Sequence, residues 1–172
     1  ENPRVVAFID GQNLFYGAKE SFGHGYPNYD PLKLAETICG SNGWNLVETC
    51  FYTGIPNSQD DGFWHHFWTA KLATMGRKGV TVFSRPLRNR NQKIKPSDGT
   101  TLTTMVGQEK GIDVRLALDI VRLALEDKYD IAVIFSQDQD LTEAVDEVKM
   151  IARRSGRWVR LACAYPSSPT SR

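Results

Sequence analysis

The sequence predicts an α/β fold in which a central five-stranded parallel sheet lies between two layers of helices. Two apolar runs, at residues 5–9 and 131–135, are typical of buried parallel strands. Stretches with apolar residues at helical spacing alternate with such runs, and this alternation favours a parallel sheet that is covered on both faces. The 172 residues, 41% of them hydrophobic, suffice for one domain with one core. We therefore expect a three-layer α/β/α sandwich at residues 1–165 and a frayed tail at 166–172.

The remaining elements follow from caps, chain breakers and periodicity. Asn13 is the expected cap of a short first helix, and Asp30-Pro31 is typical of the cap and first turn of the next helix. Gly40 and Gly156 are expected to end helices. The expected strands lie, in order, at about 5–9, 46–52, 80–83, 131–135 and 158–164, and the expected helices at about 14–21, 31–40, 59–75, 112–124 and 141–154.

The helix expected at 59–75 carries its apolar residues on two stripes, one with Phe63 and Phe67 and one with Trp64 and Trp68. We interpret both stripes as core. The alternative is that part of this aromatic surface is exposed, where it stacks on bases or meets a partner. Periodicity alone does not decide between the two interpretations.

The formal charge of +1 hides an uneven distribution along the chain. Residues 62–97 contain no acidic residue and eight basic ones. Apart from Lys71, these are Arg77, Lys78, Arg85, Arg88, Arg90, Lys93 and Lys95. Residues 85–96 are polar and interrupted by prolines, which predicts a loop or an irregular hairpin. Such a basic segment is suited to a nucleic-acid backbone, and an ordinary solvated charged loop has the same composition.

The spacing of the cysteines and the hydropathy of the chain indicate which cellular compartment to expect. Cys39, Cys50 and Cys163 lack a CxxC spacing, so neither a disulfide framework nor a zinc site is expected. We expect Cys50 and Cys163 to be buried. Apolar runs are too short to span a membrane and the N-terminus lacks a signal-peptide pattern, so the prediction is a cytoplasmic protein without a membrane partner. The chain opens on Glu1 rather than Met, which leaves additional domains in a longer chain open. A homodimer is left open as well.

Four carboxylates, those of Asp10, Asp113, Asp138 and Asp140, fall where an expected strand ends or an expected helix begins. In open α/β sheets the ligand crevice lies outside the carboxyl ends of the strands. Asp113, Asp138 and Asp140, each taken alone, are equally well explained as helix caps, whereas Asp10 is not an obvious cap because Asn13 is better placed for that role. Together they indicate a Mg²⁺ or Mn²⁺ site, because clustered carboxylates repel one another and a divalent cation relieves that repulsion. Asp119, further along the helix that begins near Asp113, is a candidate supporting residue.

Three strings resemble the signature blocks of the NYN domain family, one of the PIN-like metal-dependent nucleases: FIDGQNL at 8–14, KGIDVRLALDIV at 110–121 and IFSQDQDL at 134–141. They occur in the family's order, and the resemblance runs from about Arg4 to Ala164. It implies a sheet of order 3-2-1-4-5, a Mg²⁺ or Mn²⁺ site and phosphodiester hydrolysis, usually of RNA. By position, the family's metal-site acids correspond to Asp10, Asp113, Asp138 and Asp140, with Asn13 as the accompanying polar residue.

The last block departs from the family at Gln137, where the family commonly has glycine between the serine and the first acid. If the position needs a positive φ, glutamine adds about 1 kcal/mol or more of strain and the loop carrying Asp138 takes another path. Ser136 keeps a hydroxyl that is able to orient a carboxylate or a water.

These observations predict a metal-dependent endoribonuclease that hydrolyses single-stranded RNA. Asp10, Asp113 and Asp138 would bind one or two divalent ions, and Asp140 would complete the site directly or through water. The rival is a catalytically inactive RNA-binding module that acts through the basic segment at 77–95. An aspartyl-phosphate mechanism is disfavoured because the second acid of a DxD pattern is absent after Asp10. A dinucleotide-binding site is disfavoured because no G-x-G-x-x-G follows the first strand.

Overall fold

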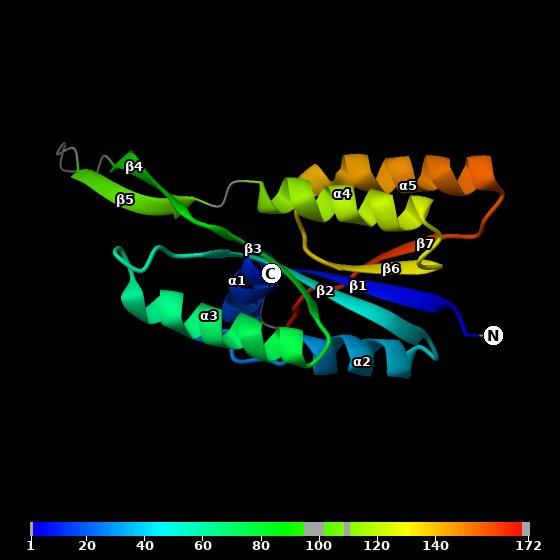
Figure 1. Cartoon of the computed structure of the whole chain (residues 1–172), viewed down its shortest axis with the longest axis horizontal. Coiled ribbons are helices and arrows are strands. Elements are labelled where there is room, and N and C mark those ends of the chain that lie inside the picture. The colour runs from blue at the N-terminus through cyan, green and yellow to red at the C-terminus, as the bar shows by residue number, and fades with distance from the viewer. Residues whose placement is uncertain (1, 95–101, 109–110, 170–172) are drawn as a thin grey trace.

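The computed structural model describes residues 2–94, 102–108 and 111–169 (Figure 1). In chain order the elements are β1 (Arg4–Asp10), α1 (Gly11–Phe22), α2 (Pro31–Ser41), β2 (Asn45–Ile55), α3 (Gly62–Arg77), β3 (Thr81–Pro86), β4 (Arg88–Ile94), β5 (Leu102–Gln108), α4 (Ile112–Leu125), β6 (Ile131–Phe135), the 3₁₀ turn η1 (Gln139–Leu141), α5 (Thr142–Ser155) and β7 (Arg160–Cys163). Within the described ranges, no helix has both the length and the apolar composition needed to cross a bilayer.

The central sheet has the strand order β3-β2-β1-β6-β7, and each neighbouring pair of strands is parallel. Counting only these strands along the chain, the order is 3-2-1-4-5, so the predicted fold class is confirmed. The register places Asp10, the last residue of β1, beside Tyr52 of β2, and the preceding Ile9 beside Phe135 at the end of β6. The residues that follow β1 and β6 therefore meet at one edge of the sheet.

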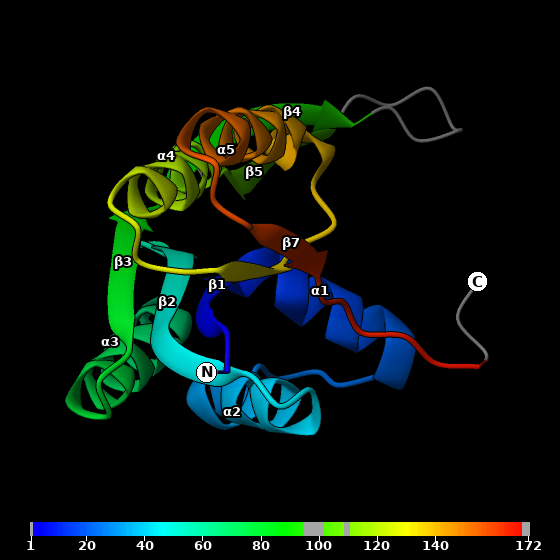
Figure 2. The same cartoon turned by 90° about the vertical axis from the view of Figure 1, so that its right-hand side faces the viewer.

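Successive side chains of β1 point to opposite faces of the sheet and fill two separate cores. Val6 and Phe8 pack with α4 and α5, whereas Val5, Ala7 and Ile9 pack with α1, α2 and α3. Figure 2 shows these two helix layers on either side of the sheet. Because both faces of β1 are covered, the strand is an uninterrupted apolar run in the sequence.

The aromatic helix α3 has one buried face and one exposed face. Trp68 is 8% exposed and lies in the core with Leu72 and Met75, whereas Phe63 is 63% exposed. The interpretation of both aromatic stripes as core is therefore wrong for Phe63, whereas Phe67 of the same stripe packs against the core while remaining partly exposed. A helix in the outer layer of a sandwich packs one stripe against the sheet and leaves the opposite side to solvent.

Cysteine burial follows the position of each strand in the sheet. Cys50 lies in β2, inside the sheet, and is buried as predicted. Cys163 lies in the edge strand β7 and is exposed, so the prediction that it is buried is wrong. An apolar run in the sequence does not distinguish an inner strand from an edge strand.

β4 and β5 form a separate two-stranded antiparallel sheet. Figure 1 shows this hairpin projecting beyond the carboxyl end of β3, on the side where α4 begins. The predicted irregular hairpin at 85–96 corresponds to β4, whereas β5 was not predicted. Neither RNRNQKI nor LTTMVGQ shows the strict alternation of a half-buried strand. Pairing with each other, rather than with a buried sheet, is what makes these segments strands.

An ion-pair cluster joins the amino ends of β1 and β6. Arg4 donates from Nε and Nη2 to the two carboxylate oxygens of Asp130 at 3.1 and 2.8 Å, and its backbone N–H donates to the same carboxylate at 2.8 Å. Arg4 also pairs with Asp127, which pairs in turn with Arg157. The hydrogen bonds from Arg4 hold the pKa of Asp130 below its ordinary range.

We expect Asp130→Asn to lower the free energy of unfolding at neutral pH by about 1 kcal/mol or less, because the ion pair is partly exposed. A carboxyl whose pKa is lowered by folding stabilises the fold above its unfolded pKa of about 4, and this contribution is lost as the pH falls through the folded pKa. Urea unfolding of both proteins near neutrality and near about pH 3 measures the effect. A stability difference that grows in acid would contradict the assignment.

Candidate functional site

Three of the four predicted carboxylates line one polar cavity of about 420 Å³ at the carboxyl ends of β1 and β6. We call it the acidic cavity. Its lining residues are Asp10, Gln12, Asn13, Tyr16, Gly17, Glu20, Asp113, Gln137 and Asp138. The sheet topology accounts for this meeting, since adjacent parallel strands deliver the residues after them to the same edge.

Asp10 connects the central strand to the helix that follows. It is 9% exposed, and its Oδ1 accepts a hydrogen bond from the backbone N–H of Asn13 at 3.0 Å. Asp10 is therefore the cap of α1, and the expectation that Asn13 caps this helix is wrong. The helix begins directly at the strand end, three residues earlier than expected. Asn13 instead accepts a hydrogen bond from the backbone N–H of Gln137 through its side-chain oxygen, at 3.0 Å.

Gly11 permits this abrupt change from strand to helix. A Cβ atom built on Gly11 would lie 2.5 Å from Cζ of Phe51 and 3.0 Å from the backbone oxygen of Tyr52. Any side chain at this position would push the first turn of α1 away from β2. The glycine therefore keeps Asp10 at the sheet edge because it lets the two backbones approach.

Ser136 ties the two acidic loops together at the end of β6. Its hydroxyl donates to Oδ2 of Asp10 at 3.4 Å and accepts from the backbone N–H of Asp138 at 3.1 Å. Asp138 in turn accepts from the backbone N–H of Asp140 at 2.9 Å. The loop does not need a left-handed residue at Gln137, because Asp127 is the one non-glycine residue with a positive φ in the described part of the chain. Glutamine is therefore accommodated at this position without that strain.

The other two acids differ in their relation to the cavity. Asp113 lies in the first turn of α4 and is exposed, and the cap residue of that helix is Gly111, so the Asp113 carboxylate is not used for capping. It lines the acidic cavity. Asp140 is exposed and does not line that cavity. The site in the structure is thus centred on Asp10, Asp113 and Asp138.

The surroundings of Asp10 disfavour its ionised form. Burial raises the pKa of Asp10, and the nearby charge of Asp138 raises it further. Hydrogen bonds from Asn13, Ser136 and Gln12 lower it, but the net result is a raised pKa. Among the described residues, no three His, Cys, Asp or Glu side chains are grouped closely enough to hold a metal ion. Mg²⁺ is commonly held by one or two carboxylates and keeps several of its waters. A pair of hard oxygen donors such as Asp10 and Asp138 fits that mode.

Asp119, predicted to support the acidic site, lies outside the acidic cavity. Its buried carboxylate accepts hydrogen bonds from the hydroxyl of Tyr52 at 3.1 Å, from Arg115 at 2.8 Å and from Arg122 at 3.2 Å. Burial raises the pKa of Asp119, but these donors outweigh burial and leave it lowered. Asp119 does not line the acidic cavity, and its contacts join α4 to β2.

The acidic cavity contains residues that the sequence analysis did not select. Gln12, Tyr16 and Glu20 line it from one side of α1. Their spacing of i, i+4 and i+8 places them on one helix face. This spacing, following an acid at a strand end, is the signal that would have identified them. Glu20 adds a fourth carboxylate to the cavity wall.

The predicted basic segment does not form one surface. Arg77 and Lys78 lie at the end of α3, in the helix layer opposite α4, and Lys78 pairs with Asp30 at 2.6 Å. Arg85 lies at the carboxyl end of β3 with its guanidinium against Gly111, where a Cβ atom would come within 2.8 Å of it. Arg88, Arg90 and Lys93 belong to β4, whose side chains are outside the described part, and Lys95 lies outside the described residues.

Two guanidinium groups flank one ring beside the start of α4. Arg85 and Arg115 lie over the ring of Phe83, with their central carbons 5.3 and 5.0 Å from its centroid. Arg115 was not selected from the sequence, because its position in an amphipathic helix gives no indication of this contact. The pair lies close to the carboxyl end of β3, from which the β4–β5 hairpin extends.

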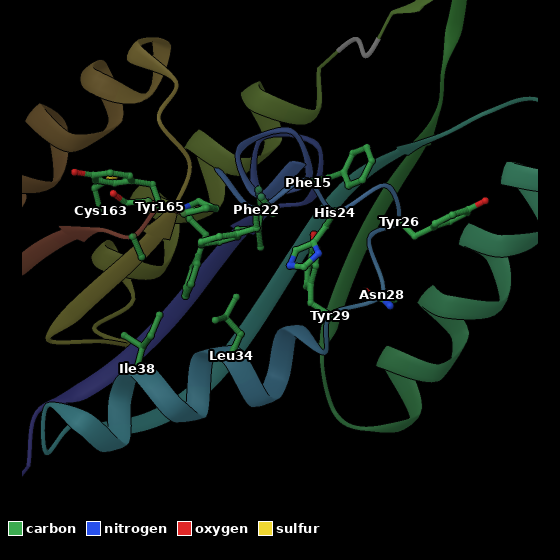
Figure 3. Close-up of a pocket in the computed structure, with 16 residues that line it drawn as sticks. Phe15, Phe22, His24, Tyr26, Asn28, Tyr29, Leu34, Ile38, Cys163 and Tyr165 are labelled. Carbon is green, nitrogen blue, oxygen red and sulfur yellow. The ribbon is translucent and has the colours of Figure 1, made fainter. Parts of the chain in front are cut away.

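The largest cavity described is apolar and separate from the acids. It has a volume of about 670 Å³ and lies between α1, α2 and the segment after β7. Figure 3 shows Leu34 and Ile38 of α2 facing Phe22 of α1 and Tyr165 across this space. None of Asp10, Asp113 and Asp138 lines it, so size alone does not identify the functional site.

Comparison with known proteins assigns the family. The model of the NYN domain matches residues 4–171. The Low amplitude and bright protein LabA of Synechococcus elongatus is 25% identical over 143 residues, which cover 83% of this chain and 66% of that protein. The chain thus spans just under two thirds of the length of that relative. Because the family model covers nearly the whole chain, this protein belongs to the NYN domain family of nuclease-type domains.

Proposed function

We propose that this protein is a ribonuclease that hydrolyses phosphodiester bonds of single-stranded RNA with the help of Mg²⁺ or Mn²⁺. The observation that carries the proposal is the acidic cavity of a nuclease-type domain, in which the buried Asp10 has a raised pKa and shares the cavity wall with Asp138 and Asp113. Unrelieved repulsion in such a cavity costs stability, and a divalent cation with a phosphate bound to it offsets that cost.

The residues around the cavity have separate roles in this proposal. Asp10, Asp113 and Asp138, which line the cavity, would bind one or two cations, and Asp140, which lies outside it, would complete the site through water. A bound Mg²⁺ or Mn²⁺ supplies a Lewis acid and lowers the pKa of a coordinated water. Ser136 orients Asp10 through its hydroxyl and holds the backbone of Asp138.

Positive charge beside the cavity supports a polyanionic substrate. Arg85 and Arg115 are stacked on Phe83 near the start of α4, the helix that carries Asp113. Stacking and the hydrogen bond from Arg115 to Asp119 keep the guanidinium groups in place. Both side chains would bind phosphates of the RNA backbone, together with basic residues of the β4–β5 hairpin. We infer an endonuclease, since the proposed path of the backbone passes along the sheet edge.

A catalytically inactive RNA-binding module is the second candidate. The observation that favours it is the spread of the carboxylates, of which no three among the described residues form a group able to hold a metal ion. This candidate predicts salt-dependent RNA binding without hydrolysis. The two candidates differ in one measurable property, which is cleavage that depends on a divalent cation.

We expect the purified chain to cleave labelled single-stranded RNA with Mn²⁺ and not with EDTA, and we expect Asp10→Asn to reduce the rate at least about a hundredfold. Losses of that size are typical when a group that stabilises transition-state charge is removed. Gel analysis of the products measures the rate and distinguishes internal from terminal cleavage. Asp146→Asn is the matched control, because Asp146 is exposed on α5 and pairs with Lys149. Undiminished cleavage by Asp10→Asn would refute the assignment.

We further expect Asp10→Asn to melt at the same or a higher temperature than the original chain in EDTA. Asparagine caps helices as well as aspartate does, and the substitution removes a buried carboxyl whose pKa is raised by folding. Such a carboxyl is destabilising where it is ionised, above its unfolded pKa of about 4, so any gain should fade as the pH falls towards that value.

Melting temperature with and without Mn²⁺ completes this prediction. Mn²⁺ at about a hundred times its Kd should stabilise the original chain by about 2.7 kcal/mol and should have little effect on Asp10→Asn. Differential scanning fluorimetry measures both shifts. Equal stabilisation of the two proteins by Mn²⁺ would place the cation away from Asp10, whatever the outcome of the cleavage assay.

A further inference from the structure

A second, aromatic cavity adjoins the acidic cavity. It has a volume of about 300 Å³, and we call it the aromatic cavity. The two cavities share Gln12 and Tyr16 of α1 as lining residues. Phe15 and Trp64 supply further rings to the aromatic cavity, and Lys19 lies at its wall. One turn of α1 therefore separates a space lined by carboxylates from a space lined by rings.

The rings of the aromatic cavity are accessible for stacking. Tyr16 is 57% exposed, and its ring centroid lies 5.4 Å from that of Phe15. Trp64 is half-buried and contacts the rings of Phe67 and Tyr26, with centroid distances of 5.2 and 5.6 Å, so its position is defined by its neighbours. A tyrosine side chain that is this exposed buries little apolar surface and so contributes little to the stability of the fold. Its contact area is available to a planar ligand.

Size and polar groups narrow the class of ligand. Small-molecule sites commonly occupy about 300 to 1,000 Å³, so the aromatic cavity accommodates one planar group rather than a stretch of polymer. The side-chain amide of Gln12 makes no hydrogen bond within the described residues, and the ammonium of Lys19 makes no ion pair there. An amide can contact the edge of a base and an ammonium can contact a phosphate. Rings, an amide and a cation together suit a nucleotide.

We propose that the aromatic cavity binds one unpaired base of a single-stranded RNA whose backbone passes through the acidic cavity. Tyr16 and Trp64 provide the stacking surfaces and Gln12 contacts the edge of the base. This inference rests on the proposed function for the position of the backbone, and it adds a reason for single-strand preference. A base in a duplex would first have to leave its stack, at a cost of a few kcal/mol.

The test is a binding measurement with two single-stranded oligomers that are matched in length and charge. Fluorescence anisotropy compares a short labelled oligouridylate with an abasic ribose-phosphate oligomer of the same length and charge. The measurements use the Asp10→Asn background, so that substrate is not consumed. Tyr16→Ala should weaken binding of the oligouridylate on the order of tenfold, the size of one lost base–ring stack, and should leave binding of the abasic oligomer unchanged. Tyr16→Phe should bind both as the parent does.

Tyr165→Ala is the matched control, because Tyr165 is 56% exposed and lines the apolar cavity instead. It should change neither affinity. Equal weakening of both oligomers by Tyr16→Ala, or no weakening of either, would overturn the proposal. Selective binding of an aromatic peptide but not of the oligouridylate would also overturn it and would assign the cavity to a protein partner.

Failure of this inference is distinguishable from failure of the proposed function. If cleavage with Mn²⁺ is absent but Tyr16→Ala still weakens binding of the oligouridylate alone, the proposal of a base site stands and the nuclease assignment fails. If cleavage is present and the base-dependent loss is absent, the aromatic cavity is not a base site and the nuclease assignment stands. Melting curves of the Tyr16 variants show that either result concerns binding and not folding.

Discussion

The structure depends on a single carboxylate with two functions. Asp10 ends the central strand β1, in which the side chains from Val5 to Ile9 are buried, and its Oδ1 caps α1. The hydrogen bond from Ser136 brings the end of β6 to the same carboxylate. Strand, helix and neighbouring loop are thereby held at one point. The arrangement of the acidic cavity originates in these contacts.

This arrangement lowers the stability of the fold when Asp10 is ionised. Burial and the charge of Asp138 both disfavour the ionised form of Asp10, and only hydrogen bonds from Asn13, Ser136 and Gln12 oppose them. Gly11 adds to the constraint, because its missing side chain lets the cap form against Phe51. A chain selected for stability alone would place an uncharged residue at the end of β1. Retaining the carboxylate at that position is understandable if the cation and the substrate supply the missing compensation.

The fold was predictable from the sequence because its signals are local and agree with one another. Apolar runs identified β1 and β6, and Asp30-Pro31 identified the start of α2. The meeting of Asp10, Asp113 and Asp138 at one cavity was predictable from their places at strand ends and at a helix start, whereas Asp140, predicted with them, lies outside that cavity. Properties that arise only from packing were not predictable. The exposure of Phe63 depends on which stripe of α3 meets the sheet. The capping role of Asp10 depends on the close approach of two backbones at Gly11. The position of Arg115 depends on its contact with the ring of Phe83, which belongs to another element.

The β4–β5 hairpin occupies a particular place in the chain. It is inserted between the edge strand β3 and α4, and its strands pair with each other and not with the central sheet. Changes in its length or composition therefore leave the register of the parallel strands intact. An insertion or deletion in the hairpin would lengthen or shorten a unit that makes no ladder with the parallel strands, so Asp10 and Asp138 would keep their places at the ends of β1 and β6.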